Sequence, residues 1–281
     1  LGIDSKRVRI LRPDTQTAIE SGPTVASRAS MVGGNATRVA AQRLNQILNW
    51  AAAKAFQCQP QQIQRHGELF VGPNEDQMTF DDVARYAREL GLSLYVQGKW
   101  QMPPLFWDFD KGTGEPYYCY TFGAQVAEVE TNLANGNTRV LGVWAAHDGG
   151  RIIFPQGAFG QMYGGIAMGI GYALTENLTY HEGYLQNLDL KSYHIPTARE
   201  VPPMDGTFVQ YDHADGPFGA LNLAEPMLLA TAPAIANALF QATGKRWRKF
   251  PLTPKVILTG SDDPAEDVSA ACRKSLGLLD A

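Results

Sequence analysis

The 281-residue chain contains few cysteines and no local metal-ligand motif. Its three cysteines, Cys58, Cys119 and Cys272, are far apart, and none belongs to a CxxC motif. The five histidines form no HxxxH or HxxH pair. Scattered cysteines in odd number argue against a disulfide framework, and structural zinc sites usually contain ligands at short spacings. We therefore expect a reducing, cytoplasmic location and no metal ion held by protein side chains alone.

Long runs of one charge and long apolar runs are also absent. The formal net charge is −4, and the short basic cluster KRWRKF at Lys245–Phe250 is interpreted as a solvated turn. The N-terminal LGIDSKRVRIL lacks the apolar core of a signal peptide. The glycine-rich segment 157–178 is interrupted by Gln161, and its apolar part is shorter than the ~20 residues that a bilayer requires. We expect no signal peptide, no membrane span and no nucleic-acid partner.

The composition that is present suits an ordered globular protein. Hydrophobic residues make up 44% and charged residues 19% of the chain, whereas disordered chains contain fewer apolar residues. Helical and strand patterns are mixed without regular alternation, which favours an α+β fold over a doubly wound sheet. We predict one unit, divided at most into two lobes at about residues 1–115 and 116–281.

In the first half of the chain, local patterns predict one strand and two helices. Alternating charged and apolar residues predict a strand at 6–12. Apolar residues spaced by three and four predict a helix at 35–56. Thr79, followed by Asp82, is expected to cap a short helix that ends at Gly91.

In the second half, two strands are predicted on either side of the sequence NLANGN. Asn135-Gly136 in this sequence is typical of a tight hairpin turn, and both strands are apolar enough to be covered on both faces. NLDLKSYHIPTARE, residues 187–200, is predicted as a strand and loop, and a last helix is expected at about 226–242. The tail from Ser261 onward is more polar.

The glycines of segment 157–178 are regularly spaced. Gly160 and Gly164 are four residues apart, as are Gly165 and Gly169. On a helix this spacing creates a side without side chains, which another backbone can approach closely.

Two further motifs each allow a structural and a functional interpretation. ASRAS, residues 26–30, precedes Gly-Gly and a helix; it is either a turn or an anion cradle of backbone N–H groups and hydroxyls. His147 and Asp148 are adjacent at the end of a strand, so their side chains point to opposite faces. We interpret this pair as structural rather than as an acid–base pair.

Glu225 is the only charged residue between Gly216 and Gly244, and Pro226 follows it. Proline suits the first turn of a helix, so Glu225 is placed to cap that helix at the positive end of its dipole. A carboxylate walled by apolar groups also has a tunable pKa, as a general base requires. Composition alone leaves both interpretations open.

Several ordered blocks resemble the C-terminal half of the molybdenum-binding subunit in the xanthine oxidase family of molybdenum hydroxylases. They span about residues 1–255 and read GPTVASRASMVGGNA, TFGAQVAEVET, TRVLGVWAAHDGGRIIFPQGAFGQMYGGIAMGIGYALTE, LKSYHIPTARE, GPFGALNLAEPMLLATAPAIANAL and PLTPKVI. The resemblance implies the fold of the molybdopterin-binding half of a xanthine oxidase-type large subunit.

The resemblance also implies site residues. Ala26, Ser27, Arg28 and Ser30 correspond to the loop that holds molybdopterin through backbone and hydroxyl groups. Gln161 corresponds to a glutamine that contacts the pterin, and Glu225 corresponds to the catalytic base beside molybdenum. In this interpretation the metal is held by the pterin rather than by protein ligands.

The chain departs from the family pattern at a few positions near these residues. Leu221 replaces a lysine, Asn222 and Ala224 replace glycines, and Ala29 replaces a hydroxyl residue of the cofactor loop. A methyl group at Ala224 is expected to crowd the site if that position requires a positive φ.

The function implied is that of a molybdopterin-binding catalytic subunit that hydroxylates an electron-poor carbon of an N-heteroaromatic substrate with water-derived oxygen. DKGTGEPYYCYTFGAQ at 110–125 resembles the corresponding segment of nicotinate- and purine-type bacterial enzymes of this family, and this resemblance favours the N-heteroaromatic class. The alternatives are an aldehyde oxidoreductase of the same family and a non-catalytic assembly subunit. The expected partners are a large subunit with the other half of the molybdopterin site, an iron–sulfur subunit with 2Fe–2S centres and an FAD subunit. The cytosine dinucleotide form of molybdopterin is one candidate cofactor.

Overall fold

The computed structural model describes residues 1–11, 14–16 and 18–259, and its contacts divide the chain into two compact units. The first unit contains residues 1–118 and the short segment Asp215–Pro217; the second contains residues 119–214 and the chain from Phe218 onward. Each unit combines helices with small sheets. The predicted α+β class is therefore confirmed. Both predictions that fall beyond Thr259, on Cys272 and on the polar tail, lie outside the described residues.

The first unit is built around one long helix, α1 (Gly34–Ala55), which a π-helical turn, η2 (Ala29–Gly33), precedes without a break. Residues 29–33, which include the end of the ASRAS motif, are thus already helical. The other elements of this unit are the 3₁₀ turns η1 (Ser5–Arg7) and η3 (Pro60–Gln62), the helix α2 (Phe80–Glu89), the antiparallel sheet of β1 (Gln64–His66), β2 (Leu69–Val71) and β3 (Gln77–Thr79), and the hairpin of β4 (Phe106–Asp108) and β5 (Thr113–Glu115).

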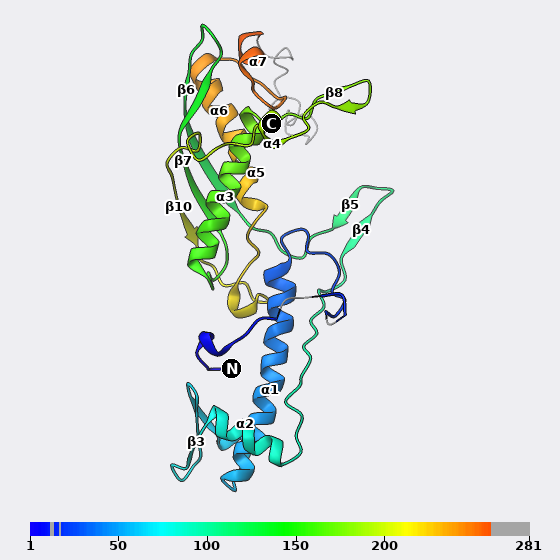
Figure 1. The fold of residues 1–281 in the computed structure, drawn as a ribbon, viewed down its shortest axis with the longest axis vertical. Coiled ribbons are helices and arrows are strands. Elements are labelled where there is room, and N and C mark those ends of the chain that lie inside the picture. Colours follow the sequence, from blue (N-terminus) through cyan, green and yellow to red (C-terminus); the bar gives the residue numbers. More distant parts are fainter. Residues whose placement is uncertain (12–13, 17, 260–281) are drawn as a thin grey trace, which may run out of the picture. The chain divides into compact units, whose positions relative to one another are not determined.

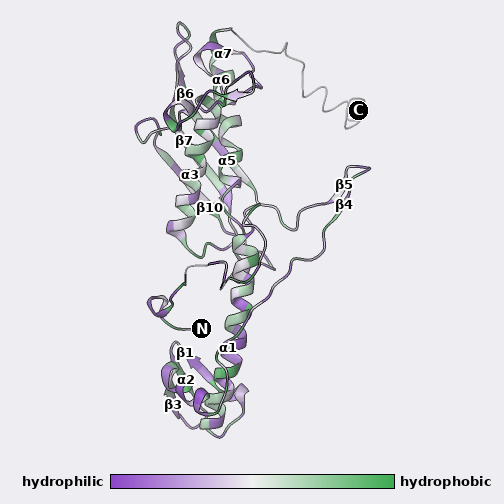
Figure 2. Cartoon of the chain, turned by 45° about the vertical axis from the view of Figure 1, so that its right-hand side comes forward, coloured by the Kyte–Doolittle hydropathy of each residue, from purple (hydrophilic) through white to green (hydrophobic). Residues whose placement is uncertain are grey.

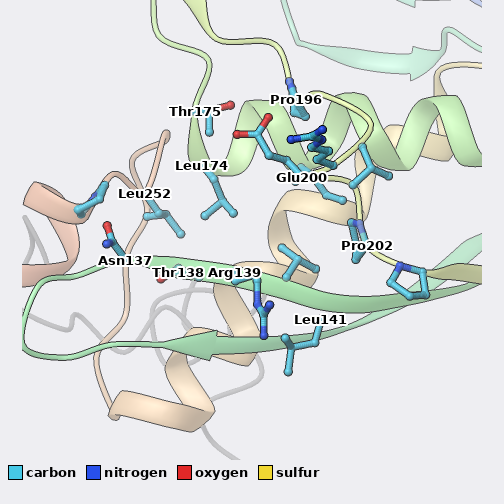
Figure 3. A pocket seen from close by; sticks show the side chains of 16 residues that line it. Asn137, Thr138, Arg139, Leu141, Leu174, Thr175, Pro196, Glu200, Pro202 and Leu252 are labelled. Carbon is cyan, nitrogen blue, oxygen red and sulfur yellow. The ribbon is translucent and has the colours of Figure 1, made fainter.

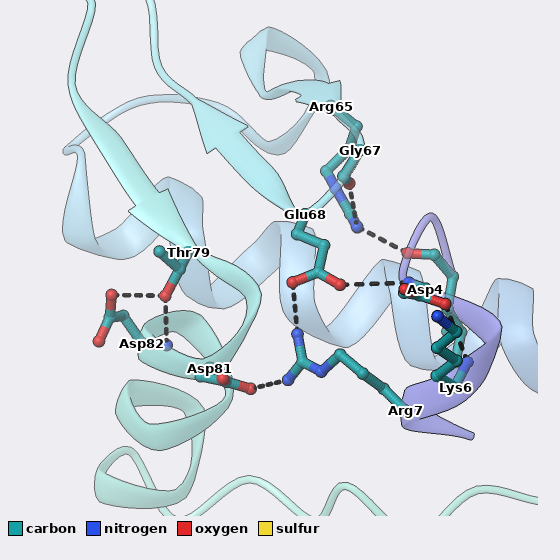
Figure 4. Close-up of polar contacts among 10 residues, drawn as sticks. Asp4, Lys6, Arg7, Arg65, Gly67, Glu68, Thr79, Asp81 and Asp82 are labelled. Atoms are coloured by element: carbon teal, nitrogen blue, oxygen red, sulfur yellow. Dashed lines mark hydrogen bonds and ion pairs between the residues drawn. The ribbon is translucent and has the colours of Figure 1, made fainter.

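The C-terminal half of α1 carries the core of this unit. Leu48 of α1, Phe70 of β2 and Val83 of α2 are fully buried in one apolar cluster. The Thr79 hydroxyl accepts a 3.2 Å hydrogen bond from the Asp82 N–H, so the predicted cap of α2 is confirmed (Figure 4). The apolar spacing of 35–56 thus predicted both the helix and its buried face.

The predicted strand at 6–12 is wrong for the residues described there. Residues 5–7 form the turn η1, and 8–11 pair with no strand. The Arg7 guanidinium binds Glu68 in the β1–β2 turn and Asp81 of α2, so ion pairs connect this segment to both (Figure 4). Alternation alone could not form a strand because a strand also needs a neighbour to accept its backbone hydrogen bonds. The apolar side chains of Val8, Ile10 and Leu11 are left exposed.

The second unit contains a three-stranded sheet in the order β10-β7-β6. β6 (Gly123–Thr131) and β7 (Thr138–Asp148) form the predicted hairpin, but residues 132–137 connect them, a longer loop than the tight turn expected at Asn135-Gly136; Gly136 in this loop has a φ of 74°. β10 (Met204–Val209) pairs with β7 in parallel. The remaining elements are α3 (Pro155–Leu174), β8 (Tyr180–His181), β9 (Tyr184–Leu185), α4 (Leu190–Tyr193), α5 (Pro226–Leu229), α6 (Thr231–Thr243) and α7 (Pro254–Thr259), and the turn η4 (Pro217–Gly219) begins at the last residue of the first unit. The strand expected within 187–200 is wrong, because α4 lies there.

Within the second unit, the described residues cover only one face of this sheet. The largely apolar helices α3 and α6 lie along it and pack against β7 and β6 (Figures 1 and 2). On the opposite face Val126 and Trp144 oppose each other across β6 and β7 and are 64% and 47% exposed. The expectation that both strands would be covered on both faces is therefore wrong for the second unit by itself.

The helix expected at 226–242 is interrupted at Ala230, where α5 ends and α6 begins. Pro233 explains the break, because its ring would clash with the carbonyl of Leu229 in a continuous helix. α6 is also not the last helix, since α7 follows it. Glu225 therefore precedes a four-residue helix rather than a long one.

The basic cluster 245–250 is not a fully solvated turn. Trp247 is buried, and its indole N–H donates to the Val256 carbonyl over 3.3 Å. The Arg246 guanidinium stacks 4.1 Å above the Phe240 ring and binds Asn237. The cluster therefore anchors the chain after α6.

Candidate functional site

The loop before α1 has an unusual backbone. Ala26 and Ser27 have φ angles of 52° and 50°, in the left-handed region that residues with a Cβ rarely occupy. The π-helical turn η2 follows directly. Strained residues and π-turns are both frequent at functional sites, because the surrounding structure must hold them in place.

This loop has the features of an anion cradle. It opens into η2 and α1, and neither has an acidic residue in its first turn to compensate the positive end of the helix dipole. Ala26 and Ser30 are exposed. A methyl group added at Gly33 would meet no atom within 4 Å, so the helix start is open on that side, whereas one at Gly34 would lie 2.8 Å from the Pro217 Cγ.

Arg28 has a structural role within this loop. Its guanidinium donates to the carbonyl oxygens of Pro23 and Ser21 over 3.0 and 2.8 Å. These bonds hold residues 21–23 against the start of η2. A cofactor contact through the backbone of Arg28 remains a prediction.

Gln161 lies on the exposed side of α3. Gly160 and Gly164 lie beside it, and a methyl group at either would meet nothing within 4 Å. Gly165 and Gly169 instead lie against α5 and α6: a methyl at Gly165 would be 2.5 Å from the Met227 Cβ, and one at Gly169 would be 2.8 Å from the Thr231 Oγ1. The expected close backbone approach is confirmed at Gly165 and Gly169, while Gly160 and Gly164 stay open.

Glu225 is the N-cap residue of α5, with Pro226 in the first turn, but its side chain makes no capping hydrogen bond to that helix. Its side chain is exposed. Within this chain the expectation of a carboxylate walled by apolar groups is therefore wrong, although Leu221 and Met227 on either side are buried. Ala224 is not among the described non-glycine residues with positive φ, so its methyl group causes no backbone strain.

The segment before Glu225 is fixed to the end of β7. The Leu221 N–H donates to the Gly149 carbonyl over 3.0 Å, and the Arg151 N–H donates to the Gly219 carbonyl over 2.9 Å. Leu221, which replaces the family's lysine, is 4% exposed and belongs to the interior rather than to a site surface.

A buried polar cluster in the second unit was not anticipated as such. Gln125 of β6 contacts His147 of β7, the Met227 carbonyl and the Thr231 hydroxyl. His147 is 1% exposed, and burial lowers its pKa. Asp148 instead accepts a hydrogen bond from the Gly150 N–H, so the structural interpretation of the His147–Asp148 pair is confirmed. No local sequence signal joins Gln125 to Thr231, because they are far apart in the chain.

A cavity of about 650 Å³ in the second unit is separate from the predicted residues. It is lined by the start of β7, the C-terminal end of α3, residues 196–203 and residues 252–254 (Figure 3). Glu200 on its rim binds the Thr197 N–H and the His194 ring, which lower its pKa to about 2. None of the predicted site residues lines this cavity.

The six predicted residues thus fall into two groups. Ala26, Ser27, Arg28 and Ser30 belong to the first unit, and Gln161 and Glu225 belong to the second. Within the described ranges no cluster of three or more histidine, cysteine or acidic side chains could hold a metal ion. None of the helices described is long and apolar enough to cross a membrane.

The loop chemistry fits an anionic cofactor such as molybdopterin. An exposed hydroxyl at Ser30, an open helix start and the lack of a competing acid in the first turns suit its phosphate group.

Comparison with known proteins identifies the same cofactor. Residues 1–202 match the family model described as a molybdopterin cofactor-binding domain. The aldehyde oxidoreductase of Megalodesulfovibrio gigas is 30% identical over 260 residues, which cover 92% of this chain and 26% of that protein. The putative xanthine dehydrogenase molybdenum-binding subunit of Escherichia coli K12 is 30% identical over 264 residues, covering 91% of this chain and 33% of that protein. The chain thus spans about a quarter to a third of these relatives.

Solved structures agree with this assignment. The aldehyde oxidoreductase of Desulfovibrio gigas superposes with a TM-score of 0.72 at 28% identity, covering 89% of this chain and 25% of that one. A Cu,Mo-CO dehydrogenase superposes with a TM-score of 0.73 at 20% identity, covering 94% of this chain and 32% of that one, which shows a shared fold alone. The chain therefore belongs to the molybdopterin cofactor-binding domain family, in the molybdenum-binding part of xanthine oxidase-type oxidoreductases.

Proposed function

We propose that this chain is the part of a molybdenum hydroxylase that contacts molybdopterin through Ala26, Ser27, Arg28, Ser30 and Gln161 and that carries Glu225 as the catalytic base. One observation carries the role of Glu225: it is an exposed carboxylate at a helix start, alone among uncharged residues from Gly216 to Gly244. When bound, the cofactor supplies the two-electron redox chemistry.

The chain's own residues bind and orient the cofactor, and one of them accepts a proton. The N–H groups at the start of η2 and the hydroxyls of Ser27 and Ser30 hold the anionic part of the cofactor. Gln161 contacts the pterin from the exposed side of α3. The Glu225 carboxylate takes up the proton that leaves the attacking, water-derived oxygen during hydroxylation.

We further propose an N-heteroaromatic substrate. Relatives named xanthine dehydrogenase and hypoxanthine oxidase support this class at 30% identity, together with the sequence at 110–125. An aldehyde substrate is the alternative, since the M. gigas aldehyde oxidoreductase is equally identical. A panel of purines, nicotinate, quinoline and aldehydes, assayed on the assembled enzyme, separates the two classes.

The remaining parts of the enzyme are proposed to lie outside this chain, because it spans only a quarter to a third of its relatives. They are a large subunit with the other half of the molybdopterin site, an iron–sulfur subunit with 2Fe–2S centres and an FAD subunit. The cytosine dinucleotide form of molybdopterin is one candidate for the cofactor. A cytoplasmic location remains a prediction.

The other candidate function of this chain is a non-catalytic assembly role. Leu221 and Ala224, which depart from the family pattern, favour it.

The variant Glu225→Gln tests the proposed base. Glutamine keeps the shape of the side chain but cannot accept the proton, so turnover should fall ~10²–10⁴-fold while molybdenum content and thermal stability stay unchanged. Glu182→Gln, at another exposed acid of the same unit, is the control and should behave like the parent. Single-turnover reduction within tenfold of the parent, at equal molybdenum content, would show that Glu225 is not the base.

A further inference from the structure

The amide of Gln125 connects the sheet to the backbone just after Glu225. Its Nε2 donates to the Met227 carbonyl over 2.6 Å and lies 3.1 Å from the His147 Nε2. Its Oε1 accepts a hydrogen bond from the Thr231 hydroxyl over 2.6 Å. One side chain of β6 therefore holds both α5 and the start of α6.

These contacts fix the orientation of the amide and the protonation of His147. The Met227 carbonyl can only accept, so the amide nitrogen must face it. The second N–H of that nitrogen then points at the His147 Nε2, which must accept and carries no proton. His147 is therefore neutral, with its proton on Nδ1, an atom that is buried without a hydrogen-bond partner.

The opposite side of the same segment rests on α3. Met227 is fully buried, and its Cβ and carbonyl carbon lie where a side chain at Gly165 would stand, 2.5 and 3.0 Å from an added methyl. The Leu228 N–H donates to the Glu225 carbonyl over 3.1 Å, which passes this restraint directly to Glu225. A helix as short as α5 has little stability of its own, so these tertiary contacts determine its position.

We propose that Gln125, held by His147 and Thr231, is a positioning residue that fixes the direction of the Glu225 carboxylate through the Met227 carbonyl. The proposal rests on the proposed role of Glu225 as base. A buried polar cluster with an unsatisfied histidine nitrogen contributes little to stability compared with an apolar core, whereas it specifies one arrangement of α5.

The test compares three variants in the assembled enzyme. Gln125→Leu removes both donors and the acceptor, and Thr231→Val removes only the hydroxyl while keeping a branched side chain. Thr131→Val is the matched control, because the Thr131 hydroxyl forms its hydrogen bond with Thr138 across the same two strands rather than with α5 or α6. Gln125→Leu and Thr231→Val should lower kcat ~10–100-fold with unchanged KM and molybdenum content, since small misplacements of a catalytic group have effects of this size. Thr231→Ser retains the hydroxyl that donates to the Gln125 Oε1, so this variant should have the same kcat as the parent.

Two further readouts separate positioning from other effects. Hydrogen exchange of the peptide covering residues 222–232 should accelerate roughly tenfold in Gln125→Leu and Thr231→Val but not in Thr131→Val. In the Glu225→Gln background, Gln125→Leu should lower kcat no further, because the group that it positions is already gone.

The outcomes are distinguishable. Unchanged exchange at 222–232 in Gln125→Leu and Thr231→Val, or an equal loss of kcat in both backgrounds, overturns the positioning role. If Glu225→Gln keeps parent turnover, the proposed base fails, and the exchange of 222–232 then decides by itself whether Gln125 fixes α5. If Gln125→Leu does not fold, the comparison of Thr231→Val with Thr231→Ser tests the same proposal.

Discussion

At the scale of single residues, the backbone of Ala26 and Ser27 is the most informative feature of the first unit. Two consecutive left-handed residues with side chains are each unfavourable by about 1–3 kcal/mol, so the surrounding structure must hold them. Arg28 does so in part, through its bonds to Pro23 and Ser21. Because the structure holds this backbone conformation despite its strain, we expect the loop to bind a ligand.

The double variant Ser27→Ala, Ser30→Ala tests that ligand. Each hydroxyl bound to a charged group is worth about 1.5–3 kcal/mol, so the purified complex should contain clearly less molybdopterin while its subunits still assemble. Thr37→Ala is the control, because the Thr37 hydroxyl is occupied by the Gly33 carbonyl in α1. Cofactor content is measured by molybdenum analysis. Full occupancy in the double variant would remove these serines from the site.

His147 predicts how stability depends on pH. Burial lowers its folded-state pKa below the ordinary value of 6.5, so the unfolded chain binds a proton that the folded chain does not. The stability that comes from neutral His147 is complete above pH 6.5 and is lost as the pH falls toward the lowered pKa, with a slope of up to about 1.4 kcal/mol per pH unit. Below pH 6.5 the unfolding free energy of the parent should therefore fall relative to that of His147→Phe, because phenylalanine does not titrate. A difference that is constant from pH 8 to 5 would contradict this account.

At the scale of elements, helix α3 divides its glycines between two uses. Gly165 and Gly169 admit α5 and α6, and Gly160 and Gly164 lie on the open side beside Gln161. The sequence spacing alone could not assign these uses, because it does not say which face meets a neighbour.

Alanine substitutions should separate the two glycine pairs. Gly169→Ala adds a methyl into Thr231 and should destabilise the chain by about 1–3 kcal/mol through overpacking, reduced by up to about 1 kcal/mol from better helix propensity. Gly164→Ala meets no atom within 4 Å and should stabilise the chain by up to about 1 kcal/mol. Denaturant unfolding of the two variants checks this order. Equal effects of both substitutions would argue against the packing described for α3.

The elements that the sequence predicted well are those with strong local signals. The helix at 35–56 followed from its apolar spacing, α2 from its Thr79 cap and the β6–β7 hairpin from Asn135-Gly136. The strand at 6–12 failed because pairing depends on a partner strand, and the break at Ala230 was missed although Pro233 signals it. At the site, the exposure of Glu225 and the contacts of Gln125 depend on distant segments, which local patterns do not contain.

At the scale of the whole molecule, apolar surface is exposed where a larger enzyme would be expected to cover it. Val8, Ile10 and Leu11 near the N-terminus are exposed, and so are Val126 and Trp144 on the open face of the sheet. Groups of exposed apolar residues on a protein surface usually mark interaction surfaces. The relatives are three to four times longer than the part matched here, so the remainder of a molybdenum-binding subunit is the expected cover.

The last prediction follows from this surface. Expressed alone, the chain should not retain one molybdopterin per molecule; with the remainder of the subunit supplied as a separate chain, the two should co-elute in size-exclusion chromatography with stoichiometric molybdenum. The expected interface is on the order of 2,000 Å² or more, as in other obligate complexes.

Val126→Lys should leave the chain's own unfolding nearly unchanged, because Val126 is 64% exposed, but should weaken association roughly tenfold or more by placing an unpaired charge in the interface. Ala134→Lys in the hairpin loop is the control and should assemble normally. A stable, cofactor-loaded monomer, or a Val126→Lys chain that assembles like the parent, would show that this sheet face is not where the enzyme is completed.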